Sequence, residues 1–161
     1  MLRQGLITPA LSEVPVTVVR VEKIVQRPPE TVFDFVAAHH FQNHPRWDPD
    51  LLEMRQTSPG AVQVGTTAHV VRRQGGRRVD GTATVTEYEP TRSASWNVEF
   101  GPFLLRQRAE LVPEQGGAAT RLRLSVDTSG RGPIKFIVPL LRGRFRTTME
   151  QSLTTIASLL E

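Results

Sequence analysis

Glycine and proline divide the middle of this sequence into short β-prone segments, and this pattern constrains the fold more than any other feature. Between residues 51 and 127, six such segments are separated by turn residues. The turn residues are Pro59-Gly60, Gly75-Gly76, Pro90, Gly101-Pro102 and Gly116-Gly117. A further segment, Pro15 to Val25, is rich in β-branched residues and is followed by Pro28 and Pro29. The pattern predicts seven antiparallel strands.

Apolar and polar residues alternate along several of these segments. One face carries Ala94, Trp96, Val98 and Phe100, and the intervening positions are mostly polar. The same alternation places Val79, Gly81, Ala83 and Val85 on one face, and likewise Leu122, Leu124 and Val126. A strand turns successive side chains to opposite faces, so the sheet has one dry face and one solvated face.

Two segments have a helical rather than a strand period. A short helix is predicted to begin near Pro29, because proline is favoured at the first helical position. At the C-terminal end, apolar residues recur at spacings of three and four and predict a helix of about twenty residues, or ~30 Å. These residues are Leu141, Phe145, Met149, Leu153, Ile156 and Leu160. Such a stripe must be buried, and the dry face of the sheet is the large apolar surface available.

Length and composition indicate one domain. The chain has 161 residues, and we expect a flexible N-terminal extension over residues 1–14 followed by a single domain over residues 15–161. Cysteine is absent, which excludes disulfides and thiolate chemistry. The net charge is only +4 and no nucleic-acid-binding motif accompanies it, so no nucleic-acid partner is expected. No stretch is apolar enough to span a bilayer, and a cytoplasmic protein without integral membrane association is predicted.

Several motifs, taken in order, resemble the SRPBCC superfamily, the START-like, birch-allergen-like and polyketide cyclase/dehydrase group. They are "VEKIVQRPPETVFDFV", "HPRWDPDL", "VGTTAHV", "VTEYEPTRSASW" and "ATRLRLSV", and the resemblance covers roughly residues 16 to 160. It implies an α+β helix-grip fold. In this fold a curved seven-stranded antiparallel sheet surrounds a long C-terminal helix, with two short helices between strands 1 and 2.

The resemblance also implies a cavity between the sheet and the C-terminal helix that binds a hydrophobic small molecule such as a lipid, polyketide or sterol-like compound. Small inward residues, Gly81, Ala83, Ala94 and Ala109, are consistent with such a space. The expected ligand-binding residues come from the inward sheet face, the closing segment and the C-terminal helix. They are Trp47, Val70, Ala83, Trp96, Val98, Gln107, Leu141, Phe145 and Met149.

Two other functions stay open. One is a polyketide cyclase or aromatase-like enzyme that uses the same cavity, with His69 as the catalytic acid/base and Gln107 orienting a carbonyl. The position of His69 is ambiguous, because both faces of its strand are equally apolar. The other is a protein-interaction module with a basic surface formed by the sheet arginines or the terminal helix.

Three histidines lie in the segment "HHFQNHPRWDPD". His40 and His44 are four residues apart, a spacing that zinc sites use on a helix. Asp48 and Asp50 lie beyond Pro45, where helix geometry is expected to stop. We therefore expect partly exposed capping and turn histidines, no metal and no cofactor. The oligomeric state is left open.

Overall fold

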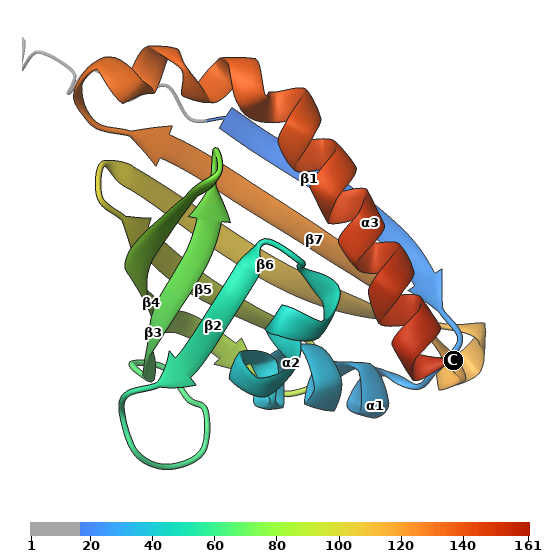
Figure 1. Ribbon diagram of the computed structural model, residues 1–161. Helices are drawn as coiled ribbons and strands as arrows, with labels where there is room; N and C mark the ends of the chain where they lie inside the picture. Colours follow the sequence, from blue (N-terminus) through green and yellow to red (C-terminus); the bar gives the residue numbers. More distant parts are fainter. Residues whose placement is uncertain (1–16) are drawn as a thin grey trace, which may run out of the picture.

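Seven antiparallel strands form one curved sheet (Figure 1). The computed structural model describes residues 17–161, so the predicted extension over residues 1–14 lies outside the described part. The spatial order is β1-β7-β6-β5-β4-β3-β2. The strands are β1 (Thr17–Val25), β2 (Leu51–Gln56), β3 (Thr67–Gln74), β4 (Arg77–Glu89), β5 (Ser93–Phe100), β6 (Phe103–Glu114) and β7 (Ala119–Gly130). The predicted number of strands and their antiparallel arrangement are confirmed.

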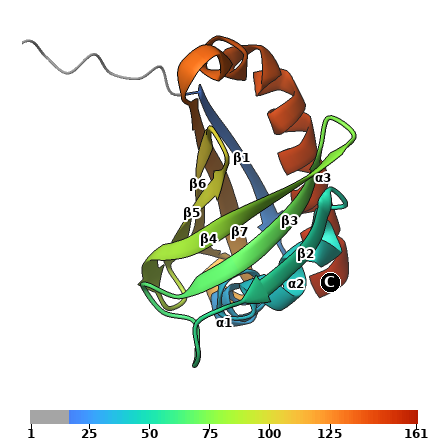
Figure 2. The same ribbon diagram turned by 60° about the vertical axis from the view of Figure 1, so that its left-hand side comes forward.

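A long C-terminal helix, α3 (Arg142–Leu160), crosses the concave side of the sheet and packs against β1 (Figures 1 and 2). The short helical segments between β1 and β2 are α1 (Pro29–Phe33), the π-helical turn η1 (Asp34–Ala38) and α2 (His40–Trp47). They cover one end of the sheet. Single 3₁₀ segments are η2 (Gln115–Gly117), η3 (Gly132–Phe136) and η4 (Val138–Leu141), of which the last two lead into α3. The helix-grip architecture is confirmed.

The second short helix is longer than the sequence analysis expected. It continues through Pro45 to Trp47, although Pro45 has no N–H to donate within the helix. The Asp48 N–H donates to the His44 carbonyl at 3.1 Å, which restores the helical pattern beyond the proline. His44, Trp47 and Asp48 are therefore held in fixed positions relative to His40.

The strand register confirms the predicted dry face. Trp96 lies opposite Val85 on one side and Gln107 on the other, and Gln107 lies opposite Val126. The outer face carries charged side chains that pair with each other. Arg121 and Arg123, for example, both contact the Glu22 carboxylate at 2.9 Å.

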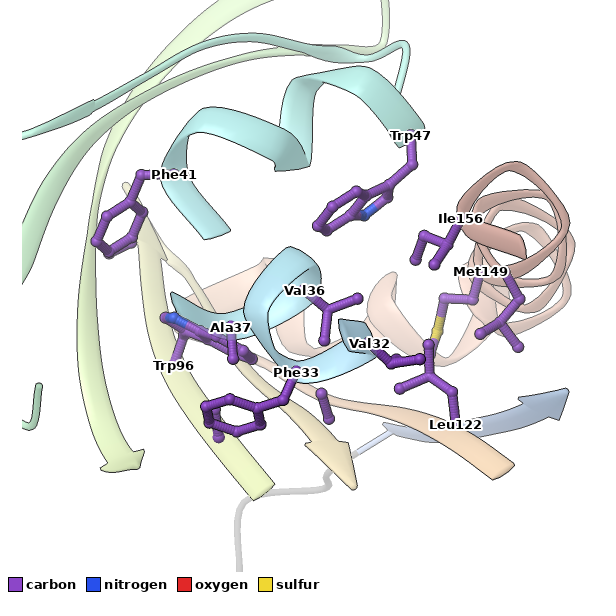
Figure 3. Packing of buried hydrophobic residues seen from close by; sticks show 14 of the residues in the cluster. Val32, Phe33, Val36, Ala37, Phe41, Trp47, Trp96, Leu122, Met149 and Ile156 are labelled. Carbon is purple, nitrogen blue, oxygen red and sulfur yellow. The ribbon is translucent and has the colours of Figure 1, made fainter. Parts of the chain in front are cut away.

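The core fills the space between the sheet, the short helices and the C-terminal half of α3 (Figure 3). Side chains from all three layers meet there. They include Val32, Phe33, Val36, Trp47, Trp96, Leu122, Met149 and Ile156. Within residues 17–161, no helix is long and apolar enough to cross a membrane.

Gly81 does not leave empty space, contrary to the expectation that small inward residues open the cavity. A Cβ atom at this position would lie 2.3 Å from the Glu99 carbonyl oxygen and 2.5 Å from Cδ1 of Phe100. The Phe100 ring thus occupies the volume that a side chain on Gly81 would need. The absence of a side chain at Gly81 allows β4 and β5 to pack closely at this point.

Alanine at Gly81 is expected to destabilise the fold by about 1–3 kcal/mol, because the added methyl group meets a backbone oxygen and a buried ring. Gly143→Ala is a matched control, since no atom lies within 4 Å of the Cβ built at Gly143 in α3. This second change should stabilise by roughly 0.5 kcal/mol. Urea denaturation measures both, and equal effects of the two substitutions would contradict the packing described for Gly81.

Candidate ligand-binding site

An internal cavity of about 480 Å³ lies between the inner face of the sheet and α3. Its walls are formed largely by apolar and aromatic side chains. These include Val36, Trp47, Trp96, Phe100, Phe103, Leu105, Leu124, Val126, Leu141, Phe145, Met149 and Ile156. Exposed lining residues come from the β3–β4 turn, with Gly75 and Gly76, and from the first turn of α3, with Arg144. The mouth of the cavity lies between these two segments.

A second hollow, of about 890 Å³, lies on the outer face of the sheet. Its lining is mainly charged and polar, and several of these side chains, such as Arg108 and Glu87 at 3.4 Å, form ion pairs with each other. A groove of paired, solvated charges offers little apolar surface to a ligand. We therefore take the inner cavity as the candidate site.

Six of the nine residues expected to contact a ligand line this cavity. They are Trp47, Trp96, Gln107, Leu141, Phe145 and Met149. The other three, Val70, Ala83 and Val98, belong to the buried core but do not line the cavity. Among the four small residues expected to leave space, Ala109 is the one that lines it. The cavity therefore results mainly from the divergence of α3 from the sheet.

Gln107 is half-buried on the inner face of the sheet, between Trp96 and Val126 in the register. Its amide provides both a donor and an acceptor to this wall of the cavity.

His69 lies on the opposite face of the sheet from the cavity. Its neighbours Ala68 and Val70 belong to the inner core, and successive strand residues point to opposite faces. His69 is absent from the cavity lining. The proposal that His69 moves a proton inside the cavity is therefore wrong, because its imidazole cannot reach a ligand there.

His40 and His44 are buried, with exposed fractions of 4% and 8%, and both line the cavity. The expectation of partly exposed histidines is therefore wrong for these two, whereas His39, at the N-cap of α2, is exposed as expected. The His40 ring stacks on Trp96 with 4.0 Å between ring centroids, and His44 stacks on Trp47 at 5.1 Å. Helix α2 brings both imidazoles to one face, the face that closes the cavity.

The hydrogen bonds define the tautomer of His40. Its Nδ1 lies 2.9 Å from the Val36 carbonyl oxygen, which can only accept, so Nδ1 carries the proton and Nε2 is an acceptor. This Nε2 is buried and has no partner among residues 17–161. The same holds for Nδ1 of His44, whose Nε2 lies 3.7 Å from the Asp48 carboxylate.

Burial keeps both imidazoles neutral. Burial, with a smaller contribution from the nearby Arg72 cation, lowers the pKa of His44 to about 3. Burial, followed by the proximity of His44, holds the pKa of His40 well below its usual value of 6.5. At neutral pH each ring therefore offers an unprotonated acceptor nitrogen in an apolar environment.

An ion pair anchors this histidine cluster to the sheet. Arg72 on β3 donates to the Asp48 carboxylate with Nη1 at 2.6 Å, and the other oxygen of Asp48 accepts from the Asp50 N–H at 3.1 Å. Sequence reasoning noted the spacing of His40 and His44 but missed their burial. The available signal was the spacing of four residues between His44 and Asp48, which places the two side chains on one face of a helix. It could have been used only if the predicted helix had been extended through Pro45.

The chain matches the family model described as polyketide cyclase / dehydrase and lipid transport over residues 16–161. Solved structures with the same fold include a START superfamily protein from Mycobacterium smegmatis, at 17% identity and a TM-score of 0.73, covering 89% of this chain and 99% of that chain. Another is the Zhui aromatase/cyclase from a Streptomyces species, at 12% identity and a TM-score of 0.73, covering 91% and 94%.

A third is a truncated norcoclaurine synthase from Thalictrum flavum, at 12% identity and a TM-score of 0.67, covering 90% of this chain and 93% of that one. The TM-scores show that these proteins share the fold of this chain, and at such low identities the similarity concerns the fold alone. A search of curated proteins found no significant match. On the family match over almost its whole length, the chain belongs to the polyketide cyclase/dehydrase and lipid transport family of the SRPBCC superfamily.

Proposed function

We propose that this protein binds a hydrophobic small molecule in the cavity between the sheet and α3. The observation that carries the proposal is the cavity itself, about 480 Å³ in volume and walled mainly by apolar and aromatic side chains. Small-molecule sites typically have volumes of ~300–1,000 Å³ and a few polar groups that fix the orientation of the ligand. The cavity of this chain has both properties.

The polar groups on the walls indicate what the ligand carries. The Trp96 Nε1 and Thr128 Oγ1 atoms are buried without a partner among the described residues, as are the two histidine nitrogens. All four side chains line the cavity. A ligand with hydroxyl or carbonyl groups on an apolar ring or chain, such as a polyketide or sterol-like compound, would satisfy these groups and that of Gln107.

Thr148→Trp is expected to abolish binding, because Thr148 lines the cavity from α3 and the indole would occupy the ligand's space. Thr147→Trp is the matched control, since its side chain is exposed on the same helix. The two tryptophans of the wild-type chain, Trp47 and Trp96, both line the cavity, so quenching of their fluorescence reports a bound ligand. The probe is 1-anilinonaphthalene-8-sulfonate, and native mass spectrometry of protein from its host identifies the natural ligand.

Equal probe affinity in the two variants would place the binding site elsewhere. A loss of binding in Thr147→Trp as well would indicate that the helix rather than the cavity had been disturbed.

A second function, catalysis of the polyketide cyclase kind, is favoured by the two neutral imidazoles of His40 and His44. An unprotonated imidazole nitrogen can remove a proton from a carbon next to a ketone, and the resulting enolate then attacks a second carbonyl of the same folded chain. The alkoxide that forms takes the proton back from the imidazolium, and elimination of water from the β-hydroxy ketone completes the reaction. Nε2 of His40 is our candidate for this base, in place of His69.

His40→Asn separates catalysis from binding, because the asparagine amide can still donate to the Val36 carbonyl while the Nε2 acceptor is lost. With a linear poly-β-ketone thioester as substrate, mass spectrometry would detect the loss of water by elimination after ring closure. The wild type and a His69→Asn control should form this product, whereas His40→Asn should bind the substrate less tightly and release it unchanged. If the wild-type protein forms the product no faster than it forms in buffer without protein, the catalytic function is contradicted and only ligand binding remains.

The stability of the fold is expected to fall as the pH is lowered below about 6.5. An unfolded histidine binds a proton near pH 6.5, whereas His44 in the folded chain does so only at a pKa of about 3. Between these values the unfolded state binds more protons, so acid favours unfolding. His44 alone accounts for a loss of about 2 kcal/mol between pH 6.5 and 5, at about 1.4 kcal/mol per pH unit.

Urea denaturation at pH 7 and pH 5 measures this loss. His44→Gln should reduce the dependence to the part that is due to His40, and substitution of the exposed His39 by glutamine should leave it as in the wild type. A wild-type free energy of unfolding that stays constant over this range would mean that neither His40 nor His44 is buried in its neutral form.

A further inference from the structure

The connection between β7 and α3 turns large apolar side chains to solvent. Phe136, Ile137 and Leu140 have exposed fractions of 72%, 46% and 81%. The described chain has three other large apolar side chains exposed to this degree, and they are scattered over Leu52, Val64 and Leu159. We call residues 131–146, which comprise η3, η4 and the first turn of α3, the basic tip. It lies at the end of the molecule opposite the C-terminus (Figure 1).

The backbone of the basic tip is anchored to the rest of the protein. Val138 is buried with an exposed fraction of 1%. Gly130 lies so close to Ile134 that a Cβ atom there would be 2.8 Å from the Ile134 Cγ2 atom. Inward residues thus hold the segment in place while Phe136, Ile137 and Leu140 point away from the core. Large apolar side chains that are exposed together on an anchored segment are typical of an interaction site.

Five basic side chains belong to the same segment as these apolar residues. All five are exposed, and between Asp127 and Glu150 the sequence contains no acidic residue. They are Arg131, Lys135, Arg142, Arg144 and Arg146. The arginines on the outer face of the sheet differ, because they are neutralised by carboxylates such as Glu22 and Glu110. No carboxylate within residues 17–161 forms an ion pair with the five basic residues of the tip. Within residues 17–161, the positive charge of the tip is therefore uncompensated.

The mixture of charge and apolar side chains favours a lipid surface over a protein partner. Lysine is depleted at protein interfaces, whereas here Lys135 lies beside the exposed ring of Phe136. At a membrane surface, by contrast, aromatic and aliphatic groups enter the headgroup–acyl boundary while lysine and arginine contact anionic headgroups. Phe136 and Leu140 project from the tip next to Lys135, whose Nζ lies 5.1 Å from the centroid of the Phe136 ring.

The position of the tip relative to the cavity gives this surface a role. Leu141, Arg144 and Phe145 belong to the tip and also line the cavity, and the β3–β4 turn across the mouth lies at the same end of the molecule (Figures 1 and 2). That turn is also basic, with Arg73 and Arg77 exposed. A bilayer that contacts the tip would therefore face the mouth of the cavity.

We propose that residues 131–146 dock this protein on the surface of an anionic lipid bilayer, with Phe136, Ile137 and Leu140 entering the headgroup–acyl boundary. The role of the docked state, the passage of an apolar ligand between the bilayer and the cavity, rests on the function proposed above. The docking itself does not.

Flotation with lipid vesicles tests the docking with the full chain. The probe is vesicles of phosphatidylcholine containing a minority of phosphatidylglycerol, compared with phosphatidylcholine alone. The wild type should bind the anionic vesicles and should dissociate from them as salt is raised. F136S/L140S should lower the partition coefficient by about tenfold for each residue removed. Lys135→Gln should lower it about fivefold, on anionic vesicles only.

Val64→Ser is the matched control, because Val64 is an exposed apolar residue, at 61%, in the loop between β2 and β3. It should bind vesicles like the wild type. Equal partitioning of the wild type and F136S/L140S overturns the proposal, as does the absence of vesicle binding in the wild type. A dimer that forms in place of vesicle binding, and that F136S/L140S abolishes, also overturns it and assigns the patch to a second copy of the chain.

Binding of 1-anilinonaphthalene-8-sulfonate in the absence of lipid separates this proposal from the proposed function. F136S/L140S should bind the dye like the wild type, since neither residue lines the cavity. Vesicle binding without dye binding in the wild-type cavity would support docking and contradict ligand binding. The reverse result would overturn docking alone.

Discussion

The attachment of α3 to the sheet at one end is the constraint on which the rest of the structure depends. Its C-terminal half is fixed by Leu153, Ile156 and Ala157, all buried against β1 and the short helices. The last residue adds polar contacts, because the Glu161 side chain accepts from the Gln26 N–H at 2.7 Å and its carbonyl accepts from Arg27 at 3.0 Å. These contacts set the angle at which the helix leaves the sheet.

Because of this angle, the N-terminal half of α3 lies away from the centre of the sheet. Arg142 and Arg146 donate to carbonyl oxygens of Val18 and Arg20, so this half is held over the edge strand β1. Phe145 and Leu141 are consequently only half-buried and line the cavity. The space is therefore a consequence of helix placement, and its mouth opens where the helix is farthest from its attachment. The exposed apolar residues of the basic tip lie at that same end.

The sequence predicted those features that depend on local periodicity. The strands, the terminal helix and the inward direction of Gln107 follow from spacings of two, three and four, and the structure confirms them. Features that depend on neighbouring strands were not predictable. The space beside Gly81 is filled by Phe100 from β5, and the orientation of His69 is settled by the pairing of β3. Val71, buried on the same side as His69, made the two faces of that strand look alike.

The polar groups of the cavity are costly to bury, and that cost indicates why they are there. A neutral imidazole without a partner, or a buried ion pair such as Arg72–Asp48, stabilises a fold less than apolar side chains of the same size. Of the five unpartnered buried side-chain atoms in the described chain, four belong to residues that line the cavity, and the fifth is Nδ1 of His69. Selection for stability alone would spread or remove such groups. Their concentration around one apolar space, on His40, His44, Trp96 and Thr128, is what a site that must recognise a polar group on an apolar ligand requires.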